Sequence, residues 1–279
     1  MKIQRTVLTL CLLLTASLLK GEQLERTYKL TGGELDLELD IDFAQVRVLP
    51  NDNSDEIYVR IRYNQKDCSA DIQYNESKNR MRVFVDWHSL FSKGDYDDND
   101  AVIVDLDLPS KPVIALKTKI KAGEIDFRLG GLSLKEFYLK NWAGEVDIDF
   151  DQPNRISMES MDVNCKIGEV NISNLGNAHC KAIDIDGGIG ELTVDFSGEF
   201  CEETFAEIDL DIGETTLILP EEAAIKMRIS DFSLFSEVDY PHDFRKQNKF
   251  LYSSNFQEQK NHLDLRISTG IGGLNFRTN

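Results

Sequence analysis

The second half of the chain repeats a short phrase, a Gly-Glu pair followed by residues of alternating polarity. The phrase begins at Gly123, Gly144, Gly168, Gly190 and Gly213, which lie 21, 24, 22 and 23 residues apart. A period of this size is typical of stacked repeats, in which one unit cannot bury its apolar edge alone and neighbouring units bury it together. The repeat therefore restricts the fold more than any other feature of the sequence.

Aligned on the glycine, the repeats place similar residues in fixed columns. Two places after the glycine stand Ile125, Val146, Val170, Leu192 and Thr215, and four places after it stand Phe127, Ile148, Ile172, Val194 and Leu217. A third apolar column, five places before, contains Leu139, Val163, Ile185 and Ile208. We expect the residue before the glycine to face the core as well, in a column of Ala122, Ala143, Ile167, Ile189 and Ile212.

These columns predict an all-β protein, a β-solenoid whose coils each contain 21–24 residues. Adjacent coils would hydrogen-bond about 4.8 Å apart in parallel sheets, with glycine at the bend because it adopts positive φ without a Cβ clash. The phrase continues at Ser236–Tyr240 and Gly272–Phe276, for about seven coils in all. The polar stretch 241–262 is interpreted as an insertion into one coil, which falls on a loop.

The first third of the exported chain has a different strand pattern. Leu35–Phe43 alternates apolar and acidic residues with a period of two, which predicts a half-buried strand. Further strands are expected at Ala44–Leu49, Glu56–Tyr63, Ser69–Tyr74, Arg80–Trp87 and Ala101–Leu108. The predicted organisation is an N-terminal β region over 22–108 followed by solenoid repeats over 109–279.

The first 21 residues have the pattern of a secretory signal peptide. Lys2 and Arg5 precede an apolar run of 13 residues, Val7–Leu19, which is short for a membrane span. The segment is either cleaved or retained as an anchor. In both cases we predict that the protein is extracytoplasmic, which means periplasmic, at the cell surface or secreted. The net charge of -18 excludes nucleic acid as a partner, because phosphate binding needs clustered Lys and Arg.

Four cysteines follow the signal, namely Cys68, Cys165, Cys180 and Cys201. An even number in an exported protein permits disulfides. Cys180 and Cys201 are about one repeat apart and are candidates for a bridge between adjacent coils. The alternative is that the cysteines are small buried apolar residues.

The residue after the glycine forms an acidic column of Glu124, Glu145, Glu169, Glu191, Glu214 and Glu237. At about 4.8 Å, two like charges repel by roughly 1 kcal/mol in water and about 3.5 kcal/mol at an effective dielectric of 20. A weakly bound divalent cation such as Ca²⁺ would relieve this repulsion, and so would splaying of the side chains into solvent. No other cofactor is expected.

Catalytic patterns are weak in this chain. Ser92–Asp100 is acidic with the alternation of an EF-hand loop, but Asp100 replaces the invariant glycine and Leu106 the bidentate glutamate. Asp147, Asp149 and Asp151 alternate along one segment, which suggests either the acidic cluster of a glycan-active enzyme or the solvent face of a strand. We predict that the protein is not an enzyme.

Aromatic residues offer another kind of site. The candidate aromatic residues are Tyr138, Trp142, Phe232, Phe235, Phe244, Phe250, Tyr252 and Phe256. They either form a binding patch on loops of the repeat scaffold or fold back to cover the open edge of the last coil.

The order and period of these motifs resemble the toast-rack β-solenoid proteins, which include the C-terminal regions of LiaF-like cell-envelope-stress proteins and the family named "putative adhesin". The resemblance rests on Leu35–Tyr63, on Leu106–Pro109, and above all on Asn174–Ala178 followed by Gly187–Gly198. LiaF-like proteins carry several transmembrane helices before the solenoid, whereas this chain has one signal segment.

The resemblance implies an exported, non-enzymatic module that binds or scaffolds components of the cell envelope, in the manner of an adhesin. The alternative is a regulatory module that senses envelope stress by docking on a membrane protein, and a glycan-active enzyme ranks third. The expected partners are an envelope component, a membrane protein or further copies of the chain.

Overall fold

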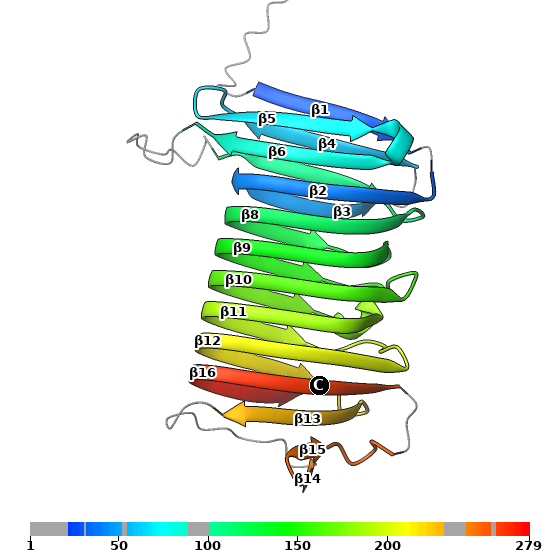
Figure 1. Ribbon diagram of the computed structural model, residues 1–279, viewed down its shortest axis with the longest axis vertical. Helices are drawn as coiled ribbons and strands as arrows, with labels where there is room; N and C mark the ends of the chain where they lie inside the picture. The colour runs from blue at the N-terminus through cyan, green and yellow to red at the C-terminus, as the bar shows by residue number, and fades with distance from the viewer. Residues whose placement is uncertain (1–21, 31, 52–54, 89–100, 232–243, 258–260) are drawn as a thin grey trace, which may run out of the picture.

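The computed structural model describes residues 22–30, 32–51, 55–88, 101–231, 244–257 and 261–279. Strands stacked along one long axis make up most of this part of the chain (Figure 1). The predicted signal segment, the acidic loop 92–100 and the phrase at Ser236–Tyr240 with Glu237 lie outside the described residues.

Long bent strands form the central coils. Each strand runs along one broad face, turns at its glycine and continues on the opposite face, and it pairs in parallel with the next strand. Gly123, Gly144, Gly168, Gly190 and Gly213 lie in register, so the predicted stack of coils is confirmed. The strands are β8 (Val113–Arg128), β9 (Ser133–Asp149), β10 (Met158–Ser173), β11 (Cys180–Asp195) and β12 (Glu203–Leu219).

The glycine corner is a point of very close backbone approach. The φ angles of the stacked glycines lie between 136° and 151°, a region that residues with a side chain rarely adopt. A Cβ added to Gly168 would lie 1.8 Å from the carbonyl oxygen of Gly144, and the other corners repeat this contact. Each coil therefore requires glycine because the preceding coil occupies the space of a side chain.

The predicted apolar columns lie inside the stack. The residues two and four places after the glycine, and those five places before it, are buried, and all of them except Thr215 belong to one continuous hydrophobic core. Burial of these side chains against the coils above and below supplies the main driving force for stacking.

The column immediately before the glycine is the exception, and the expectation that it faces the core is wrong. Ile167, Ile189 and Ile212 are exposed by 55%, 50% and 44%. At the corner, the backbone turns around the convex outside. The two residues before the glycine and the one after it therefore all face away from the core. This interrupts the alternation of inward and outward side chains. We call this line the outer apolar column; in register from coil to coil it consists of Phe43, Ala122, Ala143, Ile167, Ile189, Ile212 and Ile271.

The N-terminal region continues both broad faces with separate strands. On one face β2 pairs with β8 and β6, and β6 pairs with β5; on the other, β3 pairs with β8 and β7, β7 with β4, and β4 with β1. The sheet is thus unbroken from this region into the solenoid. The elements are β1 (Glu22–Lys29), β2 (Glu34–Phe43), β3 (Gln45–Asn51), β4 (Glu56–Tyr63), β5 (Cys68–Asn75), the 3-10 turn η1 (Glu76–Lys78), β6 (Arg80–Trp87) and β7 (Ile103–Pro109).

At the other end, the last strand of the sequence does not lie last in the stack. β16 (His262–Thr278) inserts between β12 and β13 (Ala224–Asp231), so Gly272 stacks on Gly213 (Figure 1). Gly272 therefore fills the position next to Gly213, which the spacing of the phrases had assigned to Ser236. A hairpin of β14 (Arg245–Gln247) and β15 (Phe250–Tyr252) pairs with β13 and covers that edge. A second short turn, η3 (Leu175–Ala178), lies between β10 and β11.

Candidate functional site

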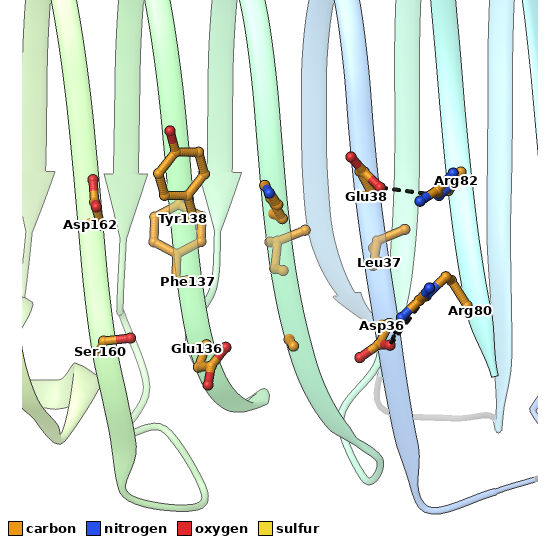
Figure 2. A pocket seen from close by; sticks show the side chains of 13 residues that line it. Asp36, Leu37, Glu38, Arg80, Arg82, Glu136, Phe137, Tyr138, Ser160 and Asp162 are labelled. Carbon is orange, nitrogen blue, oxygen red and sulfur yellow. Dashed lines mark hydrogen bonds and ion pairs between the residues drawn. The ribbon is translucent and has the colours of Figure 1, made fainter. Parts of the chain in front are cut away.

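A shallow groove crosses the broad face that precedes the glycine corner. Its volume is about 660 Å³, and it extends over β6, β2, β8, β9 and β10, where the N-terminal region meets the solenoid (Figure 2). We call it the broad-face groove. It is lined by Asp36, Leu37, Glu38, Arg80, Arg82, Ala115, Leu116, Lys117, Glu136, Phe137, Tyr138, Ser160 and Asp162.

The groove is built from two neighbouring rows of outward side chains. Because the strands pair in register, residues from distant parts of the sequence are aligned across the face. One row is Arg82, Glu38, Lys117, Tyr138 and Asp162; the other is Arg80, Asp36, Ala115, Glu136 and Ser160. The small side chains of Ala115 and Ser160 stand between longer neighbours, which makes the surface concave.

Two ion pairs fix the N-terminal end of the groove. Arg80 Nη2 lies 2.9 Å from Asp36 Oδ2, and Arg82 Nε lies 3.1 Å from Glu38 Oε2. Figure 2 shows both pairs side by side across β6 and β2. The arginines still carry donors that these contacts leave available, so this end can donate hydrogen bonds to carboxylate or hydroxyl oxygens of a ligand.

An aromatic ring and a lysine form the middle of the groove. The Lys117 ammonium lies 5.7 Å from the centre of the Tyr138 ring, within the range of a cation–π contact. The ring is half-buried and its hydroxyl is a polar handle. This combination offers an apolar surface and a charge at one point.

The far end of the groove is acidic. Burial and the nearby carboxylates of Asp184 and Asp186 raise the pKa of Asp162. The same face continues into Glu207 and Asp209, and burial with the neighbouring carboxylates raises the pKa of Asp209. The groove thus runs from an arginine end to a carboxylate end.

The acidic column predicted from the repeats lies beside the corner, away from this groove. Glu124, Glu145, Glu169, Glu191 and Glu214 are exposed and in register, and Gly273 occupies the position opposite Glu214. Glu237 is not among the described residues. Within the part of the chain that the structure describes, no group of three His, Cys, Asp or Glu side chains is arranged to hold a metal ion.

The cysteines are free thiols in the structure. Cys180 and Cys201 lie next to each other, with Cys201 Sγ 3.3 Å from the carbonyl oxygen of Cys180, but their sulfurs make separate contacts with backbone oxygens. Burial raises the pKa of Cys165 and of Cys180 to about 12 and that of Cys68 to about 11. These thiols are therefore poor nucleophiles and poor metal ligands.

Of the three alternating aspartates, Asp149 makes side-chain contacts at the end of β9. Asp149 is held by Arg128 Nη1 at 3.0 Å and by Asn174 Nδ2 at 2.8 Å, and Asp151 lies beyond the end of β9. The carboxylate of Asp149 thus stabilises the turn that leaves the face.

The aromatic residues separate into different roles. Phe244 packs against the core, and Phe250, Tyr252 and Phe256 follow one another at centroid distances of 6.3 and 5.1 Å over the last coil. Covering the edge of β13 is therefore the role of the described insertion aromatics. Tyr138 lies in the broad-face groove and Trp142 is exposed beside the corner; Phe232 and Phe235 are outside the described residues.

Sequence reasoning identified Tyr138 but missed Arg80, Arg82, Lys117 and Glu136. The groove depends on the register between strands whose paired lining residues are 21 to 79 positions apart in the sequence, which no local pattern encodes. The sequence signal that could have located the groove is the column six places before the glycine, which contains Lys117, Tyr138 and Asp162.

Solved structures similar to this chain were found, with low sequence identity. A "putative cell adhesion protein" from Clostridium sporogenes is 16% identical with a TM-score of 0.47, covering 93% of this chain and 100% of its own. A "putative adhesin" from Bacteroides fragilis is 10% identical with a TM-score of 0.36, covering 91% and 97%. No curated protein matches the chain.

The helices of the structure and a match to a family model are the remaining findings. Among the described residues, none of the helices has the length and apolar character needed to cross a bilayer. The family model described as the N-terminal domain of toast_rack, DUF2154, matches residues 22–173, which is more than half of the chain. The match begins at β1 and ends with β10, so it includes the N-terminal region, the first corners and the whole broad-face groove. The resemblance seen in the sequence is confirmed, and the chain belongs to the toast-rack family.

Proposed function

We propose that the protein is a non-enzymatic binding module of the cell envelope, adhesin-like in the sense that it holds an envelope glycan on its surface. The observation that carries the proposal is the broad-face groove, with an aromatic ring flanked by a cation and carboxylates. Sugar rings present apolar faces that pack on aromatic side chains and hydroxyl groups that bond to charged ones. The apolar run Val7–Leu19 supports export to the compartment in which such glycans lie.

The open form of the groove favours an extended ligand. It crosses five strands, so a chain molecule can lie along it and make contacts at several points. Its lining contains no histidine or cysteine, and Asp36 and Glu38 are already paired with arginines. Binding rather than bond cleavage is the chemistry that this set of side chains supports.

The test is direct binding of purified envelope polysaccharides to the immobilised protein. Tyr138→Ala and Lys117→Gln should each weaken binding by about tenfold, the equivalent of one good contact of about 1.4 kcal/mol. Lys246→Gln, an exposed lysine on β14 at the opposite end of the stack, is the matched control and should bind like the wild type. Equal affinity of the Tyr138→Ala protein would contradict the proposal, provided that its melting temperature shows an intact fold.

The alternative of a sensing module that docks on a membrane protein is favoured by a different surface. The outer apolar column is exposed along the length of the solenoid and is not used by the groove.

A further inference from the structure

We propose that the outer apolar column, together with the glutamate column beside it, is a docking edge for an amphipathic helix of a partner protein, a helix with an apolar stripe flanked by Lys or Arg. This edge is distinct from the glycan groove and goes beyond the proposed function. It does not depend on the groove's ligand.

The column exposes a line of large apolar side chains. Ile271 is exposed by 65%, and at the N-terminal end Phe43 is exposed by 36% and packs edge-on against Trp87 with ring centres 5.9 Å apart. Trp142, one place before Ala143, is exposed by 59% and widens the line. Exposed apolar residues are common singly, but an aligned series along one edge is typical of an interaction site.

The spacing of the column matches a helix laid along it. Side chains on successive coils are about 4.8 Å apart, and one helical turn rises 5.4 Å, so a helix laid along the column presents about one side chain to each coil. Ala122 and Ala143 are small, which lets such a helix approach the corner closely. From Phe43 to Ile271 the column spans six coil steps, about 29 Å, the length of a helix of about 18 residues.

The charge beside the column specifies the flank of the partner. Glu124, Glu145, Glu169, Glu191 and Glu214 stand two residues after the column on the same outward side of the corner. Five adjacent carboxylates repel one another, so a row of Lys or Arg on the bound helix relieves a cost that is present in the free protein. The complement of this edge is apolar on one side and basic on the other.

Other occupants fit less well. A second copy would bring two glutamate columns and two chains of net charge -18 together. A lipid surface would place the same glutamates among the headgroups, which are anionic in many membranes. An added β-strand has nothing to pair with, because the backbone of the central coils is already bonded to the coils on both sides.

The experiment uses the full-length exported chain and a fluorescent synthetic helix of about 18 residues, with a leucine stripe flanked by lysines. The first control peptide has the same composition in scrambled order, and the second has glutamate in place of lysine. Fluorescence anisotropy gives the affinities. We expect the lysine peptide to bind at least about tenfold more tightly than either control, the equivalent of about 1.4 kcal/mol.

Variants of the protein locate the binding. Ile189→Thr with Ile212→Thr keeps β-branching at exposed positions and should weaken binding of the lysine peptide by about tenfold or more. Leu49→Thr removes an apolar side chain that is 40% exposed and lies outside the column, and it should leave the affinity unchanged. Glu191→Gln with Glu214→Gln should weaken the binding and reduce its dependence on salt.

Three results would overturn the proposal. The scrambled peptide binding as tightly as the striped one would reveal attraction by net charge alone. A dimer in sedimentation that the isoleucine variants abolish would assign the edge to a second copy. Binding to phosphatidylcholine–phosphatidylglycerol vesicles that the same variants abolish would assign it to lipid.

Discussion

The central coils and the N-terminal region belong to one sheet, yet they fix the register of their strands differently. In the coils, like residues stack on like, and each corner glycine fits against the backbone of the coil before it. In the N-terminal region, unlike residues pair across strands, with Asp105 held by Arg47 and Arg60. In the coils, the repeated contact between glycine and backbone therefore sets the register, whereas the N-terminal region uses specific side-chain pairs.

The largest effect should come from breaking the corner. Gly168→Ala places a Cβ 1.8 Å from the Gly144 carbonyl oxygen, at a φ of 141°. Neither the backbone nor a flexible side chain can yield there, so we expect the free energy of unfolding to fall by about 4 kcal/mol or more. The urea midpoint measures this change.

Gly33 is the matched control in the N-terminal region. A Cβ added there meets nothing within 4 Å. Gly33→Ala should therefore change the free energy of unfolding by no more than about 0.5 kcal/mol. If the two variants unfold at similar urea concentrations, the close approach at the corners does not set the stability of the stack.

The second effect concerns the ion pairs of the N-terminal region. The Asp105 side chain is only 9% exposed, and it accepts bonds from Arg47 Nε at 2.7 Å and Arg60 Nε at 3.0 Å. Asp105→Asn keeps the shape but removes the charge, and we expect a loss of about 1–3 kcal/mol in the free energy of unfolding.

Arg62 serves as the control for this cluster. Its Nη2 lies 4.0 Å from Asp105 and its side chain is 46% exposed. Arg62→Ala should cost less than about 1 kcal/mol, because exposed pairs at this distance contribute little. Chemical denaturation of both variants by urea, which leaves ionic strength unchanged, separates the two contributions; equal losses would show that burial of Asp105 is unimportant.

The difference between the repeated coils and the N-terminal region also explains which parts of the fold could be predicted from the sequence. The glycine period and its apolar columns are local and repeated, so the stack follows from them, and β2 and β6 begin within one residue of their expected starts. The outward turn of Ile167, Ile189 and Ile212 was missed because alternation holds within a strand and fails around a convex corner.

Long-range order was the other part that the sequence did not reveal. β16 takes the place beside β12 although β13 comes first along the chain, and this order brings Gly272 into register with Gly213. The groove likewise depends on the pairing of β6 with β2 and of β2 with β8. Asn154 is a further example, since its buried side chain bonds to the backbone of Leu134 only because the coils stack.

A smaller effect should come from pH on the acidic end of the broad face. Burial, then the carboxylates of Glu207 and Asp186, raise the pKa of Asp184. A raised folded-state pKa means that the folded chain holds the proton better, so this contribution to stability is full below about pH 4 and is lost as the pH rises through the folded value.

Removing that charge tests the sign. Asp184→Asn should raise the urea midpoint at pH 7, by the equivalent of less than about 1 kcal/mol because the site is partly solvated. The gain over the wild type should shrink as the pH approaches about 4, near the unfolded pKa of aspartate. A variant less stable than the wild type at pH 7 would contradict the assignment of repulsion to this face.

The smallest effect is expected from calcium on the glutamate column, which the central coils have and the N-terminal region lacks. A weak site with a Kd near the added millimolar concentration stabilises the fold by about 0.4 kcal/mol. For a chain of this size that is a rise of about 1 °C in melting temperature. The melting temperature is measured in calcium chloride and in sodium chloride of matched ionic strength. The same pair of measurements is made on Glu169→Gln, which interrupts the column at its middle and should remove the rise. Identical wild-type melting temperatures in the two salts would mean that the glutamates bind no calcium at this concentration and relieve their repulsion by spreading into solvent.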